Sequence, residues 1–437
     1  MNNPMNNPMN KPMNKPMNVI RTLLLLSLCV TSAAVTAAEL RTARPESVGM
    51  SSDRLERIRP IMQAYIDDNQ LAGITTMIAR RGKIVHHETV GKLNLTTGEA
   101  LQANSLFRIY SMTKPIVSVA LMQLYEEGKF QLDDPVSEYL PAFKDVEVLV
   151  DGERVKAKHE PTMREVMSHT AGFTYGIFAN TEVDKLYRAA LYQPKRMGMA
   201  VENLEEMVDK MGTLPLLYQP GERWVYSLSA DVVGRLIEVL SGQPLDVYLR
   251  EQLFAPLGMN DTFFEVPKSK LDRFGTNHIR NKEGELTVVD SPATSRFTKD
   301  VTFFSGGGGL VSSTMDYMRF AQMLLNGGTL DGTRILSPRT IELMTVNQLD
   351  EGVKSGFGER PGVAGTFGFG LGFGIATEKP KIVSGSKGEY TWGGAAGTIF
   401  WVDPKEELVG LLMVQMMRNP INLRGQFKVL THQAIVD

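Results

Sequence analysis

The stretch "RIYSMTKPIVSVALMQLYEEG", residues 108–128, decides how the middle of the chain folds. Its apolar residues recur at helical spacing until Gly128, which predicts a helix that ends near this glycine. Proline fits only the first turn of a helix, because it has no N–H to donate and clashes with the carbonyl four residues earlier. Pro115 therefore places Ser111 and Lys114 at the N-terminal turn of the predicted helix.

Ser111 and Lys114 form an S-x-x-K motif, and a spacing of three puts both side chains on one helix face. The N-terminus of a helix carries free N–H groups and a partial positive charge, which favour negative charge on a bound group. A hydroxyl nucleophile needs an amine for its proton and backbone donors for an oxyanion. The motif alone is weak, because an N-cap serine with a solvated lysine has the same spacing. A second match, Ser384 to Lys387, lies in a glycine-flanked polar stretch.

Periodic segments occur along the rest of the chain. The patterns predict helical structure before and after the opening stretch, and strands mainly near the two ends. The segments are a helix within 51–70, a β-hairpin over 74–91 that turns at Arg81-Gly82, mostly helical structure from 111 to about 300, strands from 367 onward that include two β-rich runs flanking "DPKEE", and a final helix over 423–435.

Strands at both ends bracket a helical middle, so we expect an α+β fold. An antiparallel sheet built from both termini would carry an inserted helical domain. The sheet domain, with its flanking helices, is expected to contain residues 39–115 and 300–437, and the mostly helical domain residues 116–299.

The first 38 residues predict a low-complexity leader and a secretory signal peptide. A polar four-residue repeat covers residues 1–18 and cannot build a core, whereas Arg21 and the apolar run after it are typical of a signal cleaved after Ala37 or Ala38. An uncleaved membrane anchor is the alternative, although the run is shorter than the ~20 residues that a spanning helix needs. Cleavage would give a periplasmic or secreted protein with no stable membrane insertion.

Composition narrows the classes of function. The chain has 437 residues with 43% hydrophobic and 22% charged, as in ordinary globular proteins, and its single cysteine, Cys29, lies in the leader. Removing the leader, with three basic residues and no acid, changes the formal charge from -2 to -5. No basic run remains, so we expect no nucleic-acid partner. We expect no cofactor and no metal. The adjacent His86 and His87 point to opposite faces of a strand, so they cannot chelate one metal together.

Three motifs in order along the chain carry a family resemblance: "SMTK" at 111–114, "WVYSLSADVVGRL" around Tyr226, and "YTWGGAAGTIFWVDP" at 390–404. Together they resemble the serine β-lactamase-like hydrolases, which include class C β-lactamases, penicillin-binding DD-peptidases and family VIII carboxylesterases. The resemblance covers nearly all of the mature chain and implies a β-lactamase/transpeptidase-like fold. It implies that Ser111 is the acylated nucleophile, Lys114 its proton partner and Tyr226 a second base. Which of Lys114 and Tyr226 is neutral at rest stays open, because their titrations are coupled.

The third motif separates the subclasses of this superfamily. Its β-lactamases and DD-peptidases carry K-T-G on the strand beside the nucleophile, whereas this sequence has Trp392-Gly393-Gly394, similar to the family VIII esterases. Leu228 stands where class C enzymes have an asparagine after the tyrosine. Both differences remove polar groups that would hold a carboxylated substrate. We therefore expect a small-molecule substrate, a neutral ester with a small acyl group, bound beside Trp392, Gly393 and Gly394.

The resemblance further implies an oxyanion hole formed by the backbone N–H groups of Ser111 and Ala395. The alternatives left open are β-lactamase or D-amino-acid peptidase activity and a non-catalytic penicillin-recognition protein. An α/β-hydrolase nucleophile elbow is not supported, since no G-x-S-x-G occurs. His169 is expected to be structural, and "SGGGGL" at 305–310 is expected to be a tight turn because it lacks G-K-[ST].

Overall fold

The computed structural model describes residues 40–193, 198–355, 367–378 and 385–437, which belong to one compact unit. The predicted signal peptide and Cys29 lie outside these residues. Within the described ranges, no helix is long and apolar enough to cross a membrane.

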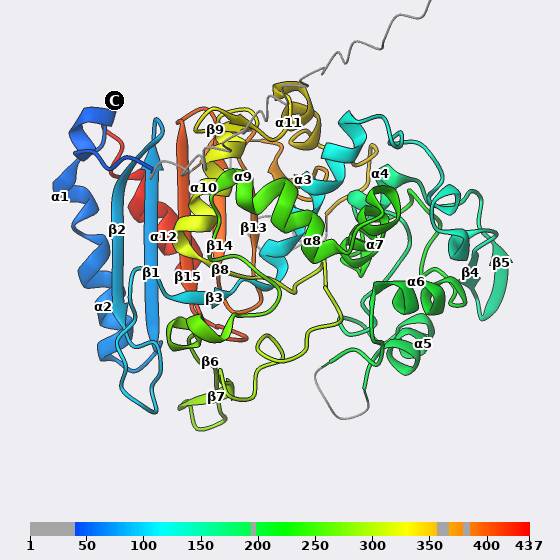
Figure 1. The fold of residues 1–437 in the computed structure, drawn as a ribbon, viewed down its shortest axis with the longest axis horizontal. Helices are drawn as coiled ribbons and strands as arrows, with labels where there is room; N and C mark the ends of the chain where they lie inside the picture. The colour runs from blue at the N-terminus through cyan, green and yellow to red at the C-terminus, as the bar shows by residue number, and fades with distance from the viewer. Residues whose placement is uncertain (1–39, 194–197, 356–366, 379–384) are drawn as a thin grey trace, which may run out of the picture. The chain divides into compact units, whose positions relative to one another are not determined.

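Seven strands form the main sheet, in the order β11-β12-β13-β14-β15-β1-β2, and every neighbouring pair is antiparallel. The first strand of the chain pairs with the last, with Ile74 opposite Val414 and Arg80 opposite Leu408 (Figure 1). This pairing confirms the α+β prediction of an antiparallel sheet built from both termini. The strands are β1 (Gly73–Arg80), β2 (Lys83–Gly91), β11 (Phe367–Phe369), β12 (Gly374–Ala376), β13 (Tyr390–Gly393), β14 (Ile399–Asp403) and β15 (Leu408–Val414).

Helices cover both faces of this sheet, because successive side chains of a strand point to opposite sides. On β1, Ile74 and Ile78 join the apolar cluster of the helices from the two chain ends, whereas Met77 and Ala79 join the larger cluster of the central helices. The first face carries α1 (Ser52–Leu55), α2 (Ile58–Asp67) and α12 (Leu423–His432), and the second carries α3 (Thr113–Glu126) and α10 (Thr314–Leu325).

The middle of the chain is mostly helical, as predicted, but it also contains two hairpins that the sequence patterns did not indicate. The predicted division into a sheet domain (39–115 and 300–437) and a helical domain (116–299) stays a prediction. The helices are α4 (Met163–Met167), α5 (Glu182–Leu191), α6 (Leu204–Gly212), α7 (Ser229–Ser241), α8 (Leu245–Leu249) and α9 (Ala255–Leu257), and the hairpins are β4 (Glu147–Val150) with β5 (Glu153–Lys156) and β6 (Asn277–Arg280) with β7 (Leu286–Asp290).

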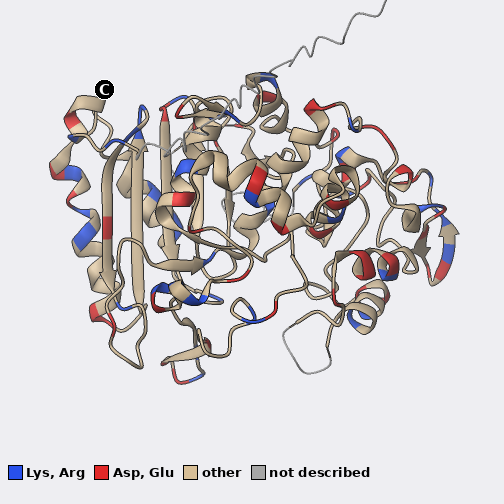
Figure 2. Ribbon diagram, in the orientation of Figure 1, with Lys and Arg blue, Asp and Glu red and all other residues tan. Residues whose placement is uncertain are grey.

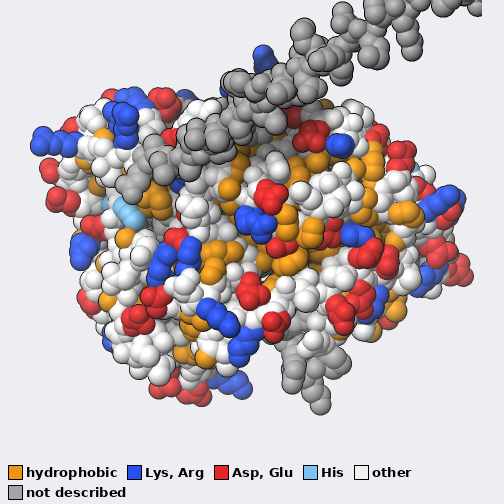
Figure 3. All heavy atoms as spheres, viewed as in Figure 1, with side chains coloured by type: hydrophobic (Ala, Val, Ile, Leu, Met, Phe, Trp, Pro, Cys, Tyr) orange, Lys and Arg blue, Asp and Glu red, His pale blue; other side chains and the backbone are white. Residues whose placement is uncertain are grey.

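Figure 2 shows lysine and arginine residues interspersed with aspartate and glutamate residues on the elements in view. Hydrophobic side chains gather over α7 and α8 on the face drawn in Figure 3. The expectation of no nucleic-acid partner stays a prediction.

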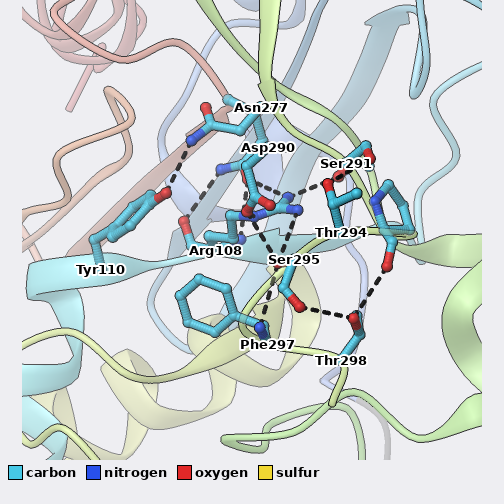
Figure 4. Close-up of polar contacts among 12 residues, drawn as sticks. Arg108, Tyr110, Asn277, Asp290, Ser291, Thr294, Ser295, Phe297 and Thr298 are labelled. Carbon is cyan, nitrogen blue, oxygen red and sulfur yellow. Dashed lines mark hydrogen bonds and ion pairs between the residues drawn. The ribbon is translucent and has the colours of Figure 1, made fainter. Parts of the chain in front are cut away.

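A strained turn leads into the α3 helix. After β3 (Leu106–Arg108), which pairs with β8 (Val311–Ser313), Tyr110 adopts a positive φ of 44° and opens a 3₁₀ turn at Tyr110–Met112. Bulky residues rarely adopt this conformation, so the surroundings must hold it. The Tyr110 hydroxyl accepts a hydrogen bond from Asn277 Nδ2 at 2.9 Å, and its ring lies edge-on to Phe297 (Figure 4).

Arg108, fully buried at the end of β3, ties this turn to the rest of the fold. Its guanidinium pairs with Asp290 (Figure 4). It also donates to the carbonyl of Gly275 at 2.7 Å and to Gln415 Oε1 at 3.3 Å. The ring of Phe274 lies 3.9 Å from the guanidinium carbon. One side chain thus connects the β3 strand, the β6–β7 hairpin and the segment after β15.

We predict that Asp290→Ala lowers the free energy of unfolding by about 3–5 kcal/mol, because it leaves the buried Arg108 charge without its carboxylate. Urea unfolding measures the change. In the control, Arg339→Met removes a surface pair in which Arg339 and Glu342 are 88% and 62% exposed, and it should change stability by less than about 1 kcal/mol. Equal losses in both variants would contradict a structural role for the buried pair.

Candidate active site

The Lys114 side chain lies at the centre of the candidate site. It is 1% exposed, and its Nζ lies 3.3 Å from Ser111 Oγ, 3.0 Å from Tyr175 Oη and 2.6 Å from the carbonyl oxygen of Gly307. These partners come from the turn before α3, the loop after α4 and the glycine-rich loop before β8. The structure therefore brings Ser111 and Lys114 together at the start of the predicted helix.

Tyr226, just before α7, shares this site. Its ring centre lies 4.7 Å from Lys114 Nζ, and its side chain is hydrogen-bonded to that of Tyr175. Burial raises the pKa of Tyr175 well above its ordinary value of 10, and the neighbouring Tyr226 acts in the same direction. Tyr175 therefore keeps its proton and can donate it to Tyr226 while it accepts a hydrogen bond from Lys114. The catalytic roles of Ser111, Lys114 and Tyr226 stay predictions.

The glycine-rich loop at 305–309 forms the predicted turn, and the structure adds a contact with the site that the sequence did not indicate. Asp231 on α7 accepts hydrogen bonds from Ser305 Oγ at 2.5 Å and from the N–H of Gly307 at 3.0 Å. A Cβ on Gly307 would lie 2.5 Å from Asp231 Oδ2 and 3.0 Å from Tyr175 Oη. Only glycine therefore allows this carbonyl to approach Lys114.

Asp231 is a buried acid whose pKa responds to Lys114. Burial raises this pKa, whereas the hydrogen bond from Ser305, the charge of Lys114 and the hydrogen bond from Gly307 lower it. Asp231 thus interacts with Lys114 through its charge and, by way of Gly307, through the loop that contacts the amine.

Gly394 brings the end of β13 against the turn that carries Ser111. A Cβ there would lie 2.2 Å from Thr398 Oγ1 and 2.5 Å from the carbonyl oxygen of Ile109, two residues before Ser111. Ala395 follows directly, beside the turn that carries Ser111. Its N–H and that of Ser111 stay predicted oxyanion donors.

Trp392 and Gly393 complete the predicted substrate side of β13. Trp392 is 6% exposed, and its ring centre lies 5.6 Å from that of Tyr226 and 5.2 Å from that of Phe369, so it belongs to the core and also faces the site. A Cβ on Gly393 would lie 3.0 Å from the Arg424 guanidinium. The glycines thus make room for parts of the protein itself, whereas we expected them to make room for substrate; their substrate contacts stay predicted.

Arg424, in the first turn of α12, is a residue that the sequence reasoning missed. Its Nε donates to the carbonyl of Gly397 at 3.1 Å and its Nη2 to that of Gly394 at 2.5 Å. These carbonyls flank Ala395 in the loop between β13 and β14. The only signal in the sequence was a basic residue at the start of the final helix.

His169 lies beside Tyr226 in a structural position. Its ring centre is 5.1 Å from that of Tyr226, its Nδ1 is 3.1 Å from Ser227 Oγ, and its carbonyl accepts from the N–H of Val225. Burial lowers its pKa well below 6.5, and the charge of Lys114 acts in the same direction, so the ring is neutral. The sequence reasoning singled out His169 in this segment and passed over Tyr175, six residues later.

Comparison with known proteins shows which family the chain belongs to. Residues 58–427 match the family described as Beta-lactamase. The chain belongs to the beta-lactamase family.

Several curated proteins resemble this beta-lactamase-family chain. Protein Rv1367c of Mycobacterium tuberculosis is 33% identical over 361 residues, which are 80% of this chain and 87% of that protein. Esterase EstB of Burkholderia gladioli is 27% identical over 383 residues, or 82% and 89% of the two chains. A putative D-alanyl-D-alanine carboxypeptidase of Escherichia coli K12 is 25% identical over an alignment 461 residues long, which covers 95% of this chain and 98% of that protein.

A solved structure supports the fold assignment for this family member. EstCE1, described as a hydrolase with promiscuous acyltransferase activity, superimposes with a TM-score of 0.73 and covers 88% of this chain and 99% of its own. At 23% identity, this likeness supports the β-lactamase/transpeptidase-like fold alone.

We predict that Lys114→Met lowers the rate at which a fluorophosphonate probe labels Ser111 by ~100-fold or more, because the hydroxyl loses its proton partner. Gel fluorescence at several times measures the rate. Lys185→Met, which changes a half-exposed lysine on α5 that pairs with Glu182, is the matched control and should label like wild type. Unchanged labelling of Lys114→Met would remove the lysine from the chemistry.

Proposed function

We propose that this protein is a serine carboxylesterase that cleaves neutral esters through an acyl-serine intermediate. One observation carries the proposal: Lys114 Nζ lies 3.3 Å from Ser111 Oγ while two other oxygens occupy its remaining sides. The predicted signal peptide would direct the enzyme to the periplasm or outside the cell.

In the first step, Lys114 is the acceptor of the Ser111 proton. The Gly307 carbonyl and the Tyr175 hydroxyl accept hydrogen bonds from its amine, and the side of Nζ that faces Ser111 Oγ is left for this proton. Ser111 Oγ loses this proton as it bonds to the ester carbonyl carbon, and the carbonyl oxygen becomes an oxyanion held by two backbone N–H groups.

The second half of the reaction returns the proton. The carbon–oxygen bond to the alcohol breaks, and the leaving alkoxide takes a proton from Lys114 or Tyr226, which are linked through Tyr175. Water then bonds to the acyl carbon of the acyl-serine and gives a proton to the same bases. The bond from this carbon to Ser111 Oγ breaks, Oγ takes the proton back, and the carboxylic acid leaves. An alcohol in place of water would make the reaction an acyl transfer.

The preference for neutral esters rests on the groups around the nucleophile. Trp392 replaces the lysine of K-T-G, and Leu228 is 2% exposed within the core rather than a polar group facing substrate. Phe178 is 67% exposed, and its ring centre lies 5.8 Å from that of Tyr226. An aromatic side chain at this place favours an apolar substrate group.

Cleavage of D-alanyl peptides or β-lactams is the second candidate. The resemblance to putative D-alanyl-D-alanine carboxypeptidases over 95% of the chain favours it. The side chains named above offer no cation at position 392 for the substrate carboxylate, so we rank it below the esterase.

We predict that Ser111→Ala abolishes turnover of p-nitrophenyl acetate and butyrate, because the acylated oxygen is removed. Liberated p-nitrophenol, followed by absorbance, is the measurement. Ser384→Ala alters the serine of the second S-x-x-K match and should retain wild-type rates. Nitrocefin tested alongside discriminates the subclass: faster hydrolysis of nitrocefin than of both esters would overturn the esterase proposal, as would full activity of Ser111→Ala.

We predict that Arg424→Met lowers kcat for p-nitrophenyl butyrate by ~10-fold or more and changes KM less. The loop that carries Ala395 would lose the guanidinium that joins its two carbonyls, and the oxyanion forms only in the transition state. Steady-state kinetics give both constants. Arg418→Met, at an exposed position before α12, should keep both constants. A rise in KM alone would contradict a role in positioning the oxyanion donors.

A further inference from the structure

A buried cluster of ionisable side chains lies at the end of β13 that is farther from Ser111. Glu389 precedes β13, Asp403 ends β14 and His432 ends α12. The two carboxyl side chains are 0% exposed and the imidazole is 8% exposed. Gly393, at the other end of β13, borders the loop of the active site, so the cluster is one strand length away from the nucleophile turn.

Two polar atoms in this cluster have no hydrogen-bond partner among the described residues. Lys428 pairs with Glu389 through Oε1, which leaves Glu389 Oε2 unpartnered. The Nε2 atom of His432 has no hydrogen bond of ordinary length either, and its nearest charged contact is Asp403 Oδ2 at 3.7 Å. A buried polar atom without a partner costs free energy, so both atoms are suited to a bound group.

The histidine is oriented as a ligand. Its Nδ1 lies 2.9 Å from the carbonyl oxygen of Lys428, one turn earlier on α12. A carbonyl can only accept, so Nδ1 carries a hydrogen and this contact orients the ring; metal-bound histidines likewise donate from the ring nitrogen that does not bind the metal. The Nε2 atom lies 3.7 Å from Asp403 Oδ2, and one ligand atom each of Glu389, Asp403 and His432 lies within 4.8 Å of the others.

The cluster places two buried carboxyl groups beside a single lysine. Buried carboxylates are usually paired or coordinate a metal, and the Oε2 atom of Glu389 has no partner among the described residues.

We propose that Glu389, Asp403 and His432 bind one divalent cation of intermediate softness, with Zn²⁺ the best fit and water completing its coordination. Imidazole and carboxylate ligands suit zinc, at about 2.0–2.2 Å from the ion. Ligand atoms around such an ion are about 3.4 Å apart, so the side chains must close by roughly 1 Å.

Neighbouring residues hold two of the proposed ligands, Glu389 and Asp403, in place. Lys428 contacts the second oxygen of Glu389, and the N–H groups of Ser386 and Glu406 donate to Asp403 at 3.1 and 3.3 Å. Outer contacts of this kind orient metal ligands. The bound ion would fasten the C-terminal end of α12 to β13 and β14, independently of any ester chemistry.

The test uses the full chain, freed of metal with EDTA and then titrated with zinc chloride. Calorimetry should give one zinc per chain, and thermal unfolding should shift upward by a few degrees at saturation. His432→Gln should reduce the zinc affinity at least 10-fold and remove the shift. His159→Gln is the matched control: His159 contacts Glu165 at 2.9 Å but lies outside the cluster, so zinc binding should stay unchanged.

X-ray absorption at the zinc edge of the wild-type protein makes the test independent of whether the variant folds. One imidazole and oxygen ligands are expected. The proposal is overturned by the absence of stoichiometric zinc, by a zinc shell with no imidazole or with more than one, or by equal binding to His432→Gln and wild type. In the first case the cluster is an ion-pair network that holds α12 without a metal.

Discussion

The candidate site depends on a lysine amine buried in the interior and surrounded by oxygen atoms. Taking such a group out of water is costly unless other polar groups replace the water. Here Ser111, Tyr175 and the Gly307 carbonyl do so from three separate segments. Each segment must be in place for the others to be stable, so the start of α3, the loop after α4 and the glycine-rich loop form one unit.

The predicted nucleophile, Ser111, lies in a turn whose backbone conformation is unfavourable. Tyr110 has a positive φ, and contacts with Asn277 and Phe297 hold its side chain. Arg108, two residues earlier, anchors the same strand through Asp290. The β6–β7 hairpin and the loop after it therefore help to fix the position of Ser111, because they contact Tyr110 and Arg108 just before it.

The α12 helix contacts both the loop that carries Ala395 and the buried carboxyl groups of Glu389 and Asp403. Arg424 in its first turn contacts the loop of the predicted oxyanion donor, and Lys428 and His432 near its end contact the buried carboxyl groups. β13 runs between these regions, with Glu389 before it and Gly393 at its end. A change in how this helix packs on the sheet would thus reach the active-site loop.

The sequence alone determined the local features that follow from short-range physics. Pro115 and Gly128 predicted the start and end of α3, and Arg81-Gly82 predicted the turn between β1 and β2. The family resemblance supplied the predicted roles of Ser111, Lys114 and Tyr226, because their short motifs occur in a fixed order along the chain.

Contacts between distant segments were decided only by the tertiary structure. Tyr175, Gly307 and Arg424 carry no motif of their own, and each acquires its place from a partner far away in the chain. The same holds for Glu389, Asp403 and His432, whose spacing in the sequence resembles no metal motif. Spacing along a chain encodes neighbours within a helix or hairpin, whereas the packing of separate elements arises from the whole core at once.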